Sequence, residues 1–206
     1  MALTTYTELK AAIADWLLRS DATTAIPDFI DLAEKDMARK VRHWRMESRS
    51  TATLDTRYSA LPADFLEPIR LSITSGTTYE LELASQAEIL DRRERGANVS
   101  GRPLVYALSG GEIEVQPAPD GEYTLEMLYY ARTAALSGSN ASNWILTYYP
   151  DAYLFGALAF SAPYFKEDER IPVWRKMYDE AIAGIAHDNH KTKFGGTGQR
   201  LKIRSY

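Results

Sequence analysis

The stretch PDAYLFGALAF at Pro150–Phe160 decides the fold, because it contains the longest uninterrupted apolar run of the chain, residues 152–160. That run is well short of the roughly 18 apolar residues of a membrane span, so we expect no span here. Pro150 suits the first turn of a helix. Three small residues in the stretch would let a neighbouring backbone come close: Gly156, Ala157 and Ala159. The stretch therefore predicts a helix that other elements pack against.

The residues after this stretch predict a last helix, which starts near Pro172 and ends near Asn189. One apolar stripe recurs along it at helical spacing, formed by Trp174, Tyr178, Ala181, Ile182 and Ile185. The C-terminal half of the chain is thus expected to hold a pair of helices.

Two further helices are expected near the N-terminus. Thr5 followed by Glu8 is a capping box, which begins an amphipathic helix over residues 6–19. Its apolar stripe is Leu9, Ile13, Trp16 and Leu17. Pro27 opens the second helix, whose early aspartates and late cations suit the helix dipole. The stripe of this helix would be Phe29 or Ile30, Ala33, Met37, Val41 and Trp44. The two stripes predict a helical hairpin.

The sequence between these helical pairs is typical of strands. From Glu47 onward and again around Leu81, apolar and polar residues alternate. Leu61-Pro62 and Glu67-Pro68 prevent a long helix in this region.

A short helix, a hairpin and a further strand follow. Ser85 caps the helix, and Gly96 would end it. Residues 104–108 and 112–116 flank Ser109-Gly110-Gly111 and predict a β-hairpin. The next strand would present one face made of Tyr123, Leu125, Met127 and Tyr129. Turn composition makes residues 133–143 the return link to the helices, so the strands predict one compact antiparallel unit.

The fold class predicted from this order is α+β, a four-helix bundle interrupted by an antiparallel β-rich insertion and followed by an extended C-terminal tail. We expect the bundle to comprise residues 1–46 and 144–190, and the insertion residues 47–143 with one short helix. Residues 191–206 would form a flexible, basic tail.

The composition is that of an ordinary globular protein, with 45% hydrophobic and 25% charged residues among 206. The chain has no cysteine, which excludes disulfides, thiolate metal ligands and a cysteine nucleophile. A formal net charge of −4 argues against a general DNA binder, since such binding comes from neutralising phosphates with Lys and Arg. Residues 1–10 lack a basic start followed by an apolar stretch, so we expect synthesis in the cytoplasm.

Two pairs of glutamates have the chemistry of an acid and a base. Glu112 with Glu114, and Glu80 with Glu82, would lie on common strand faces. Strand alternation explains them more simply, because solvent-facing positions beside buried apolar residues are polar. We therefore expect no catalytic residue.

Neither a metal nor a cofactor is expected. His187 and His190 fall on one helical face near Asp188, but no distant third ligand accompanies them. The glycines of residues 194–198 lack the Lys and Ser/Thr of a phosphate loop. Two further sets have an ordinary structural interpretation. A solvated helix face explains Arg92, Arg93 and Arg95, and core packing explains Trp16, Trp44, Trp144 and Trp174.

Taken together, the sequence resembles the podovirus-type bacteriophage head-to-tail adaptors, also called portal adaptors or tail tubular protein A. The resemblance spans nearly the whole chain. It is carried by short patches in a fixed order: Tyr6-Thr7-Glu8-Leu9, Trp16-Leu17, Phe29-Ile30-Asp31-Leu32-Ala33-Glu34, the basic residues 39–45, Leu61-Pro62-Ala63-Asp64-Phe65-Leu66, Val115-Gln116-Pro117-Ala118-Pro119-Asp120, Leu128-Tyr129-Tyr130, Asn143-Trp144 and Tyr149-Pro150-Asp151.

The resemblance implies a structural, non-enzymatic protein of the virion at the head-tail junction. Its partners would be the phage portal protein, neighbouring adaptor subunits in a homo-oligomeric ring, expected to be a dodecamer, and the tail nozzle protein. DNA would pass through the channel without specific binding. Two alternatives remain open from the residues: a tail-associated glycan hydrolase that uses Glu112, and a carbohydrate-binding tail module that uses aromatic residues such as Tyr129.

The C-terminal tail is the expected contact with the portal or a neighbouring subunit. Residues 200–204 alternate charged and apolar side chains, which suits addition as a strand to an exposed sheet edge. The residues expected to bind the partner are Lys191, Lys193, Phe194, Arg200, Leu201, Lys202, Ile203, Arg204 and Tyr206.

Overall fold

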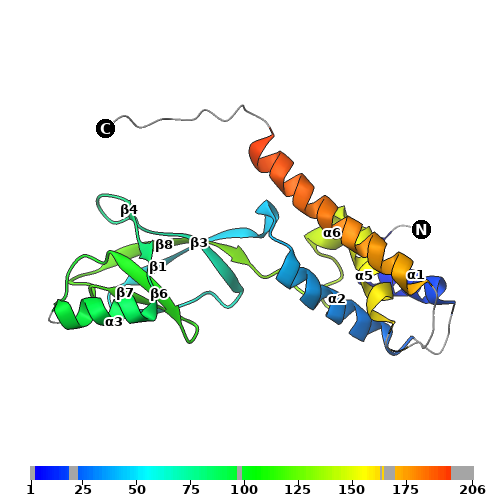
Figure 1. The fold of residues 1–206 in the computed structure, drawn as a ribbon, viewed down its shortest axis with the longest axis horizontal. Helices are drawn as coiled ribbons and strands as arrows, with labels where there is room; N and C mark the ends of the chain where they lie inside the picture. Colours follow the sequence, from blue (N-terminus) through cyan, green and yellow to red (C-terminus); the bar gives the residue numbers. More distant parts are fainter. Residues whose placement is uncertain (1–2, 19–22, 97–98, 163, 165–169, 196–206) are drawn as a thin grey trace. The chain divides into compact units, whose positions relative to one another are not determined.

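A computed structural model describes residues 3–18, 23–96, 99–162, 164 and 170–195. The chain forms two compact units, residues 1–45 with 133–206 and residues 46–132. The first unit is helical and the second is built from two sheets and one helix (Figure 1).

The described residues of the first unit form five α-helices: α1 (Tyr6–Leu17), α2 (Ile26–Lys40), α4 (Trp144–Tyr148), α5 (Pro150–Phe160) and α6 (Ile171–Phe194). Helix α5 contacts each of the other four, and α6 lies alongside it (Figure 1). The residues that α5 buries lie all around it: Ala152, Tyr153, Leu154, Gly156, Ala157, Leu158 and Ala159. A helix that is apolar on every side must be covered on every side, so α5 is the centre of this unit.

The small residues of α5 predicted the close approach of a neighbouring backbone, whereas the close neighbours of Gly156 are side chains. A Cβ atom there would lie 3.0 Å from Tyr178 Cε2 and 3.1 Å from the Cβ of Ala33. Gly156 therefore lets side chains of α2 and α6 pack directly against the α5 backbone.

The predicted four-helix bundle is wrong. Helices α1 and α2 each contact α5 more extensively than they contact each other, so they are not a self-contained hairpin. The short helix α4, which Asn143 caps through its side chain, is a fifth element that the prediction lacked. The physical reason is that α5 is apolar on all sides. Other elements must therefore cover it all around, whereas each helix of a four-helix bundle buries only one apolar face.

Two helix ends also differ from expectation. Helix α1 stops at Leu17 because Leu18 adopts a left-handed conformation with φ of 54°. Helix α6 continues past Asn189 to Phe194, so residues 191–194 are helical and not part of an extended tail. No helix in the described ranges is long and apolar enough to cross a membrane.

In the second unit, the described strands form two four-stranded sheets. In the first, the order is β1 (Glu47–Leu54), β8 (Tyr123–Ala131), β3 (Phe65–Ile73) and β4 (Tyr79–Glu80). In the second, it is β2 (Tyr58–Ala60), β7 (Glu112–Gln116), β6 (Val105–Ser109) and β5 (Glu82–Leu83). All pairs are antiparallel except β5 with β6, which is parallel.

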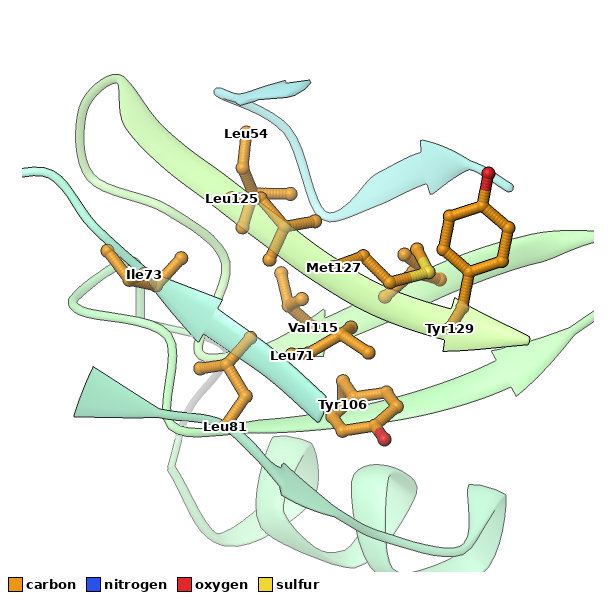
Figure 2. Packing of buried hydrophobic residues seen from close by; sticks show 10 residues of the cluster. Leu54, Leu71, Ile73, Leu81, Tyr106, Val115, Leu125, Met127 and Tyr129 are labelled. Carbon is orange, nitrogen blue, oxygen red and sulfur yellow. The ribbon is translucent and has the colours of Figure 1, made fainter. Parts of the chain in front are cut away.

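The inner faces of the two sheets share one apolar core, shown in Figure 2. Sheet 1 contributes Leu54, Leu71, Ile73, Leu125, Met127 and Tyr129, and sheet 2 contributes Tyr106, Ile113 and Val115. The alternation that predicted the face of β8 is thus confirmed at Leu125, Met127 and Tyr129.

Helix α3 (Gln86–Arg95) covers the other face of sheet 2. Its Ile89 packs with Val105 and Ala107, which alternate along β6 with the core residue Tyr106. As predicted, Ser85 Oγ accepts a hydrogen bond from the Glu88 backbone N–H at 3.2 Å. The predicted hairpin is also present, with positive φ at Gly110 and Gly111. The central strands of sheet 2, β6 and β7, are therefore largely buried on both faces.

Candidate functional site

The residues predicted to bind a partner are divided by the end of α6. Lys191, Lys193 and Phe194 lie in its last turns, where Phe194 is exposed and contacts the His190 ring at 5.1 Å between centroids. The others fall outside the described residues: Arg200, Leu201, Lys202, Ile203, Arg204 and Tyr206.

A cavity of about 590 Å³ lies beside this end of α6. Three short segments line it, the turn after α2, the junction of α4 with α5, and the last turns of α6. The lining residues are His43, Trp44, Arg45, Tyr148, Tyr149, Asp188, Lys191, Thr192 and Gly195. We call this cavity the aromatic-cation pocket.

His43 anchors the pocket. Its side chain is only 1% exposed and stacks on Trp144, with ring centroids 4.9 Å apart and planes 18° apart. The Tyr149 ring meets it edge-on at 6.1 Å. The His43 Nδ1 atom accepts a hydrogen bond from the Arg45 backbone N–H at 3.3 Å. His43 thereby fixes the backbone from which the Arg45 side chain projects.

Asn189 of α6 holds the same turn from the other side. Its Oδ1 accepts a hydrogen bond from the Trp44 backbone N–H at 2.8 Å, and its Nδ2 donates to the Arg42 carbonyl oxygen at 3.2 Å. These bonds replace helical partners that the backbone loses after α2 ends at Lys40.

The Arg45 guanidinium lies between two aromatic rings. Its central carbon is 3.9 Å from the Tyr148 ring centroid and 4.5 Å from the Trp44 ring centroid. Tyr148 is 54% exposed and Trp44 is 37% exposed. Arginine stacked in this way keeps its in-plane N–H groups available as donors. The pocket therefore presents a positioned cation at an accessible aromatic surface.

A second polar group closes the pocket. The Tyr149 hydroxyl donates a hydrogen bond to Asp188 Oδ2 at 3.0 Å. Burial and this carboxylate together raise the pKa of Tyr149, so its hydroxyl keeps its proton and holds Asp188 in place.

The glutamate pairs considered as acid and base are not arranged as expected. Glu114 is buried, not solvent-facing, and pairs with Arg93 of α3, because α3 covers that face of sheet 2. Tyr58 also donates to its Oε1 atom at 3.4 Å. Glu80 and Glu82 lie on β4 and β5, in different sheets, with the buried Leu81 between them. The expected common strand face does not exist for this second pair.

The histidines near the end of α6 have no partner set for a metal. Within the described parts of the chain, no three His, Asp or Glu side chains are grouped closely enough to hold an ion.

The three arginines of α3 each pair with a carboxylate. Arg92 pairs with Glu88 at 2.8 Å and Arg95 with Asp91 at 2.9 Å, one helical turn away in both cases. Arg93 pairs with the buried Glu114, so this arginine does not belong to the solvated helix face that the sequence predicted.

The tryptophans only partly follow the core-packing interpretation. Trp174 is buried, whereas Trp16 is 45% exposed and Trp44 is 37% exposed. Trp16 packs edge-on against Phe155 of α5.

Sequence reasoning missed the aromatic-cation pocket because its parts are far apart in the chain. The sequence pattern places Arg45 only in the basic patch 39–45 and Tyr149 only in the Tyr149-Pro150-Asp151 patch, and nothing in it singles out Tyr148. The sequence signal that could have indicated the pocket is the pair Trp44-Arg45 after α2 together with Tyr148-Tyr149 between α4 and α5.

Comparison with known proteins gives the identity of the chain. No curated protein matches it at a significant level. A family model described as SU10 adaptor protein matches residues 4–200, which includes nearly all of both units. The chain therefore belongs to the SU10 adaptor protein family of bacteriophage head-to-tail adaptors, and it is a structural component of a virion.

Proposed function

We propose that copies of this chain form a ring, a dodecamer, below the portal protein and connect it to the tail nozzle protein. The observation that carries the proposal is the family match over residues 4–200. In this role the chain is made in the cytoplasm of the host and acts without enzymatic activity, and DNA passes through the ring without sequence-specific contacts.

A ring of identical subunits requires two different, complementary faces on each subunit. The division of the chain into two compact units supports this role, since each unit has a surface of its own for neighbours and partners. Exposed apolar side chains occur on both, for example Trp16 and Met177 in the first unit and Leu83 and Leu90 in the second.

We further propose that the C-terminal segment contacts the portal or a neighbouring subunit. Lys191, Lys193 and the exposed Phe194 would continue this contact along the last turns of α6. Alternation of charged and apolar residues over 200–204 supports strand addition to a partner sheet.

The test is to mix the purified chain with portal rings and to image the product by electron microscopy. We expect a second ring with as many subunits as the portal. A chain ending at Gly195 and a full-length chain carrying Leu201→Asp with Ile203→Asp should bind the portal at least tenfold more weakly. If both variants bound the portal normally, the proposed contact through the C-terminal segment would be wrong, but the proposed ring would stand. Absence of any ring with the full-length chain would overturn the adaptor proposal for this partner.

A further inference from the structure

We infer that the aromatic-cation pocket is a binding site for a carboxylate side chain of a protein partner, flanked in that partner by an apolar residue. The inference adds a named contact to the adaptor role, yet its chemistry can be tested without ring assembly.

The first argument is the state of Arg45. Among the residues that the structure describes, its guanidinium has aromatic neighbours, Trp44 and Tyr148, and no carboxylate within ion-pair distance. A guanidinium group in a fixed orientation can donate two parallel hydrogen bonds to one carboxylate, which makes a carboxylate a well-matched ligand for it. The guanidinium of Arg45 is therefore positioned by its aromatic neighbours to donate to a carboxylate of a partner.

The second argument is the charge of the lining. Arg45 and Lys191 bring two positive charges, and Asp188 brings one negative charge. The α6 C-terminus adds partial negative charge, which the N-terminus of α5 beside Tyr149 offsets. One net positive charge suits a single carboxylate. Nucleic acid, by contrast, is bound through a track of cations along successive phosphates.

The third argument is the wall of the pocket. Trp44 and Tyr148 remain substantially exposed while they contact Arg45, so an apolar side chain next to the carboxylate would gain burial against them. Aromatic residues with an arginine are the typical composition of the centre of a protein interface.

The probe is a pair of capped peptides, acetyl-Gly-Glu-Phe-Gly-amide and the same peptide with Gln in place of Glu. Both are titrated into the intact chain, followed by NMR signals of the Trp44 indole and the Arg45 guanidinium. We expect saturable shifts with the Glu peptide and binding about tenfold weaker with the Gln peptide. Arg45→Gln and Lys191→Gln should weaken binding of the Glu peptide. Lys176→Gln changes a residue of α6 outside the pocket and should leave that binding unchanged.

Equal binding of the two peptides would overturn the inference, and this comparison needs no variant that could misfold. Unchanged binding by Arg45→Gln, with an unchanged melting temperature, would overturn it as well. A short DNA duplex is the third arm. If it shifts the same signals at lower concentration than the Glu peptide, the pocket binds phosphate and the inference is wrong. Failure of ring assembly with portal would leave the peptide result intact, so the two proposals can fail separately.

Discussion

The Tyr178 hydroxyl of α6 donates a 2.8 Å hydrogen bond to Asp36 Oδ2 of α2, and both residues are buried. Lys40 and Arg39 reach the same carboxylate at 2.7 and 3.1 Å. Burial by itself pushes the pKa of Asp36 upward, but the hydrogen bonds from Lys40, Tyr178 and Arg39 outweigh it, and the pKa is lowered. A charged aspartate thus links two helices that pack around α5.

Tyr178→Phe should lower the free energy of unfolding by about 1.5–3 kcal/mol at neutral pH, because it removes a buried hydrogen bond to a charged group. Asp36 has a lowered pKa in the folded state, so its contribution is present above the ordinary aspartate pKa and is lost as the pH falls through the folded value. The difference between variant and wild type should therefore shrink in acid. Urea unfolding at several pH values measures it. Tyr123→Phe, which removes an exposed bond to Asp120, is the control and should leave the unfolding midpoint close to that of the wild type.

Glu34 should show the opposite dependence on pH. Its carboxylate accepts hydrogen bonds from the Leu136 backbone N–H and the Tyr153 hydroxyl, but burial outweighs them and raises its pKa. Stability from this group is full below the ordinary glutamate pKa and is lost as the pH rises through the folded value. Glu34→Gln keeps an acceptor and removes the titration, so its melting temperature should fall less than that of the wild type between pH 4 and pH 7.

The control for that measurement is Glu34→Ala, which leaves both donors without their acceptor. It should cost about 1–3 kcal/mol at any pH in this range. If Glu34→Gln and the wild type had the same pH profile, the charge on this partly buried carboxylate would not affect stability.

Gly156 and Gly184 form a matched pair for testing helix packing. An added Cβ at Gly156 would meet Tyr178 at 3.0 Å and Ala33 at 3.1 Å, whereas one at Gly184 in α6 would meet nothing within 4 Å. Gly156→Ala should therefore destabilise by about 1–3 kcal/mol through overpacking. Gly184→Ala should stabilise by up to about 1 kcal/mol through helix propensity. Thermal unfolding of the two variants decides, and equal shifts would contradict the close packing at Gly156.

Local signals in the sequence were enough for most elements. The capping box at Thr5, the cap at Ser85, the glycine pair after β6 and the proline that begins α5 each act on neighbouring backbone. Each is found where predicted. The apolarity of residues 152–160 is also visible in the sequence, and it argues against the predicted four-helix bundle. A helix without a polar side cannot be one of four equal members of a bundle.

Features that depend on contacts between distant segments could not be predicted from local sequence patterns. Alternation predicted a solvent-facing Glu114, and only the position of α3 on sheet 2 makes it buried. Asp36 and Glu34 likewise lie in a helix with an ordinary polar pattern, and their burial depends on α5 and α6, more than a hundred residues away. The aromatic-cation pocket needs three such segments at once.

The ion pair between Arg93 and Glu114 provides the last test, because it decides whether Glu114 is structural. Glu114 is buried, and a glycan hydrolase would need its carboxylate free to exchange a proton. Removing one partner of a buried pair leaves the other charge uncompensated. Glu114→Ala should therefore cost about 1–3 kcal/mol, less than for a fully buried pair, since Arg93 is 30% exposed.

Two companions make this result specific. Glu88→Ala breaks the exposed pair with Arg92 on the same helix and should cost under about 0.5 kcal/mol. The double variant Arg93→Met with Glu114→Leu removes both charges together, and apolar replacement of a buried pair is often neutral or stabilising. It should recover most of the stability that Glu114→Ala loses. If Glu114→Ala unfolded at the same urea concentration as the wild type, the pair would contribute nothing to the packing of α3 on sheet 2, and another reason for a buried glutamate would have to be found.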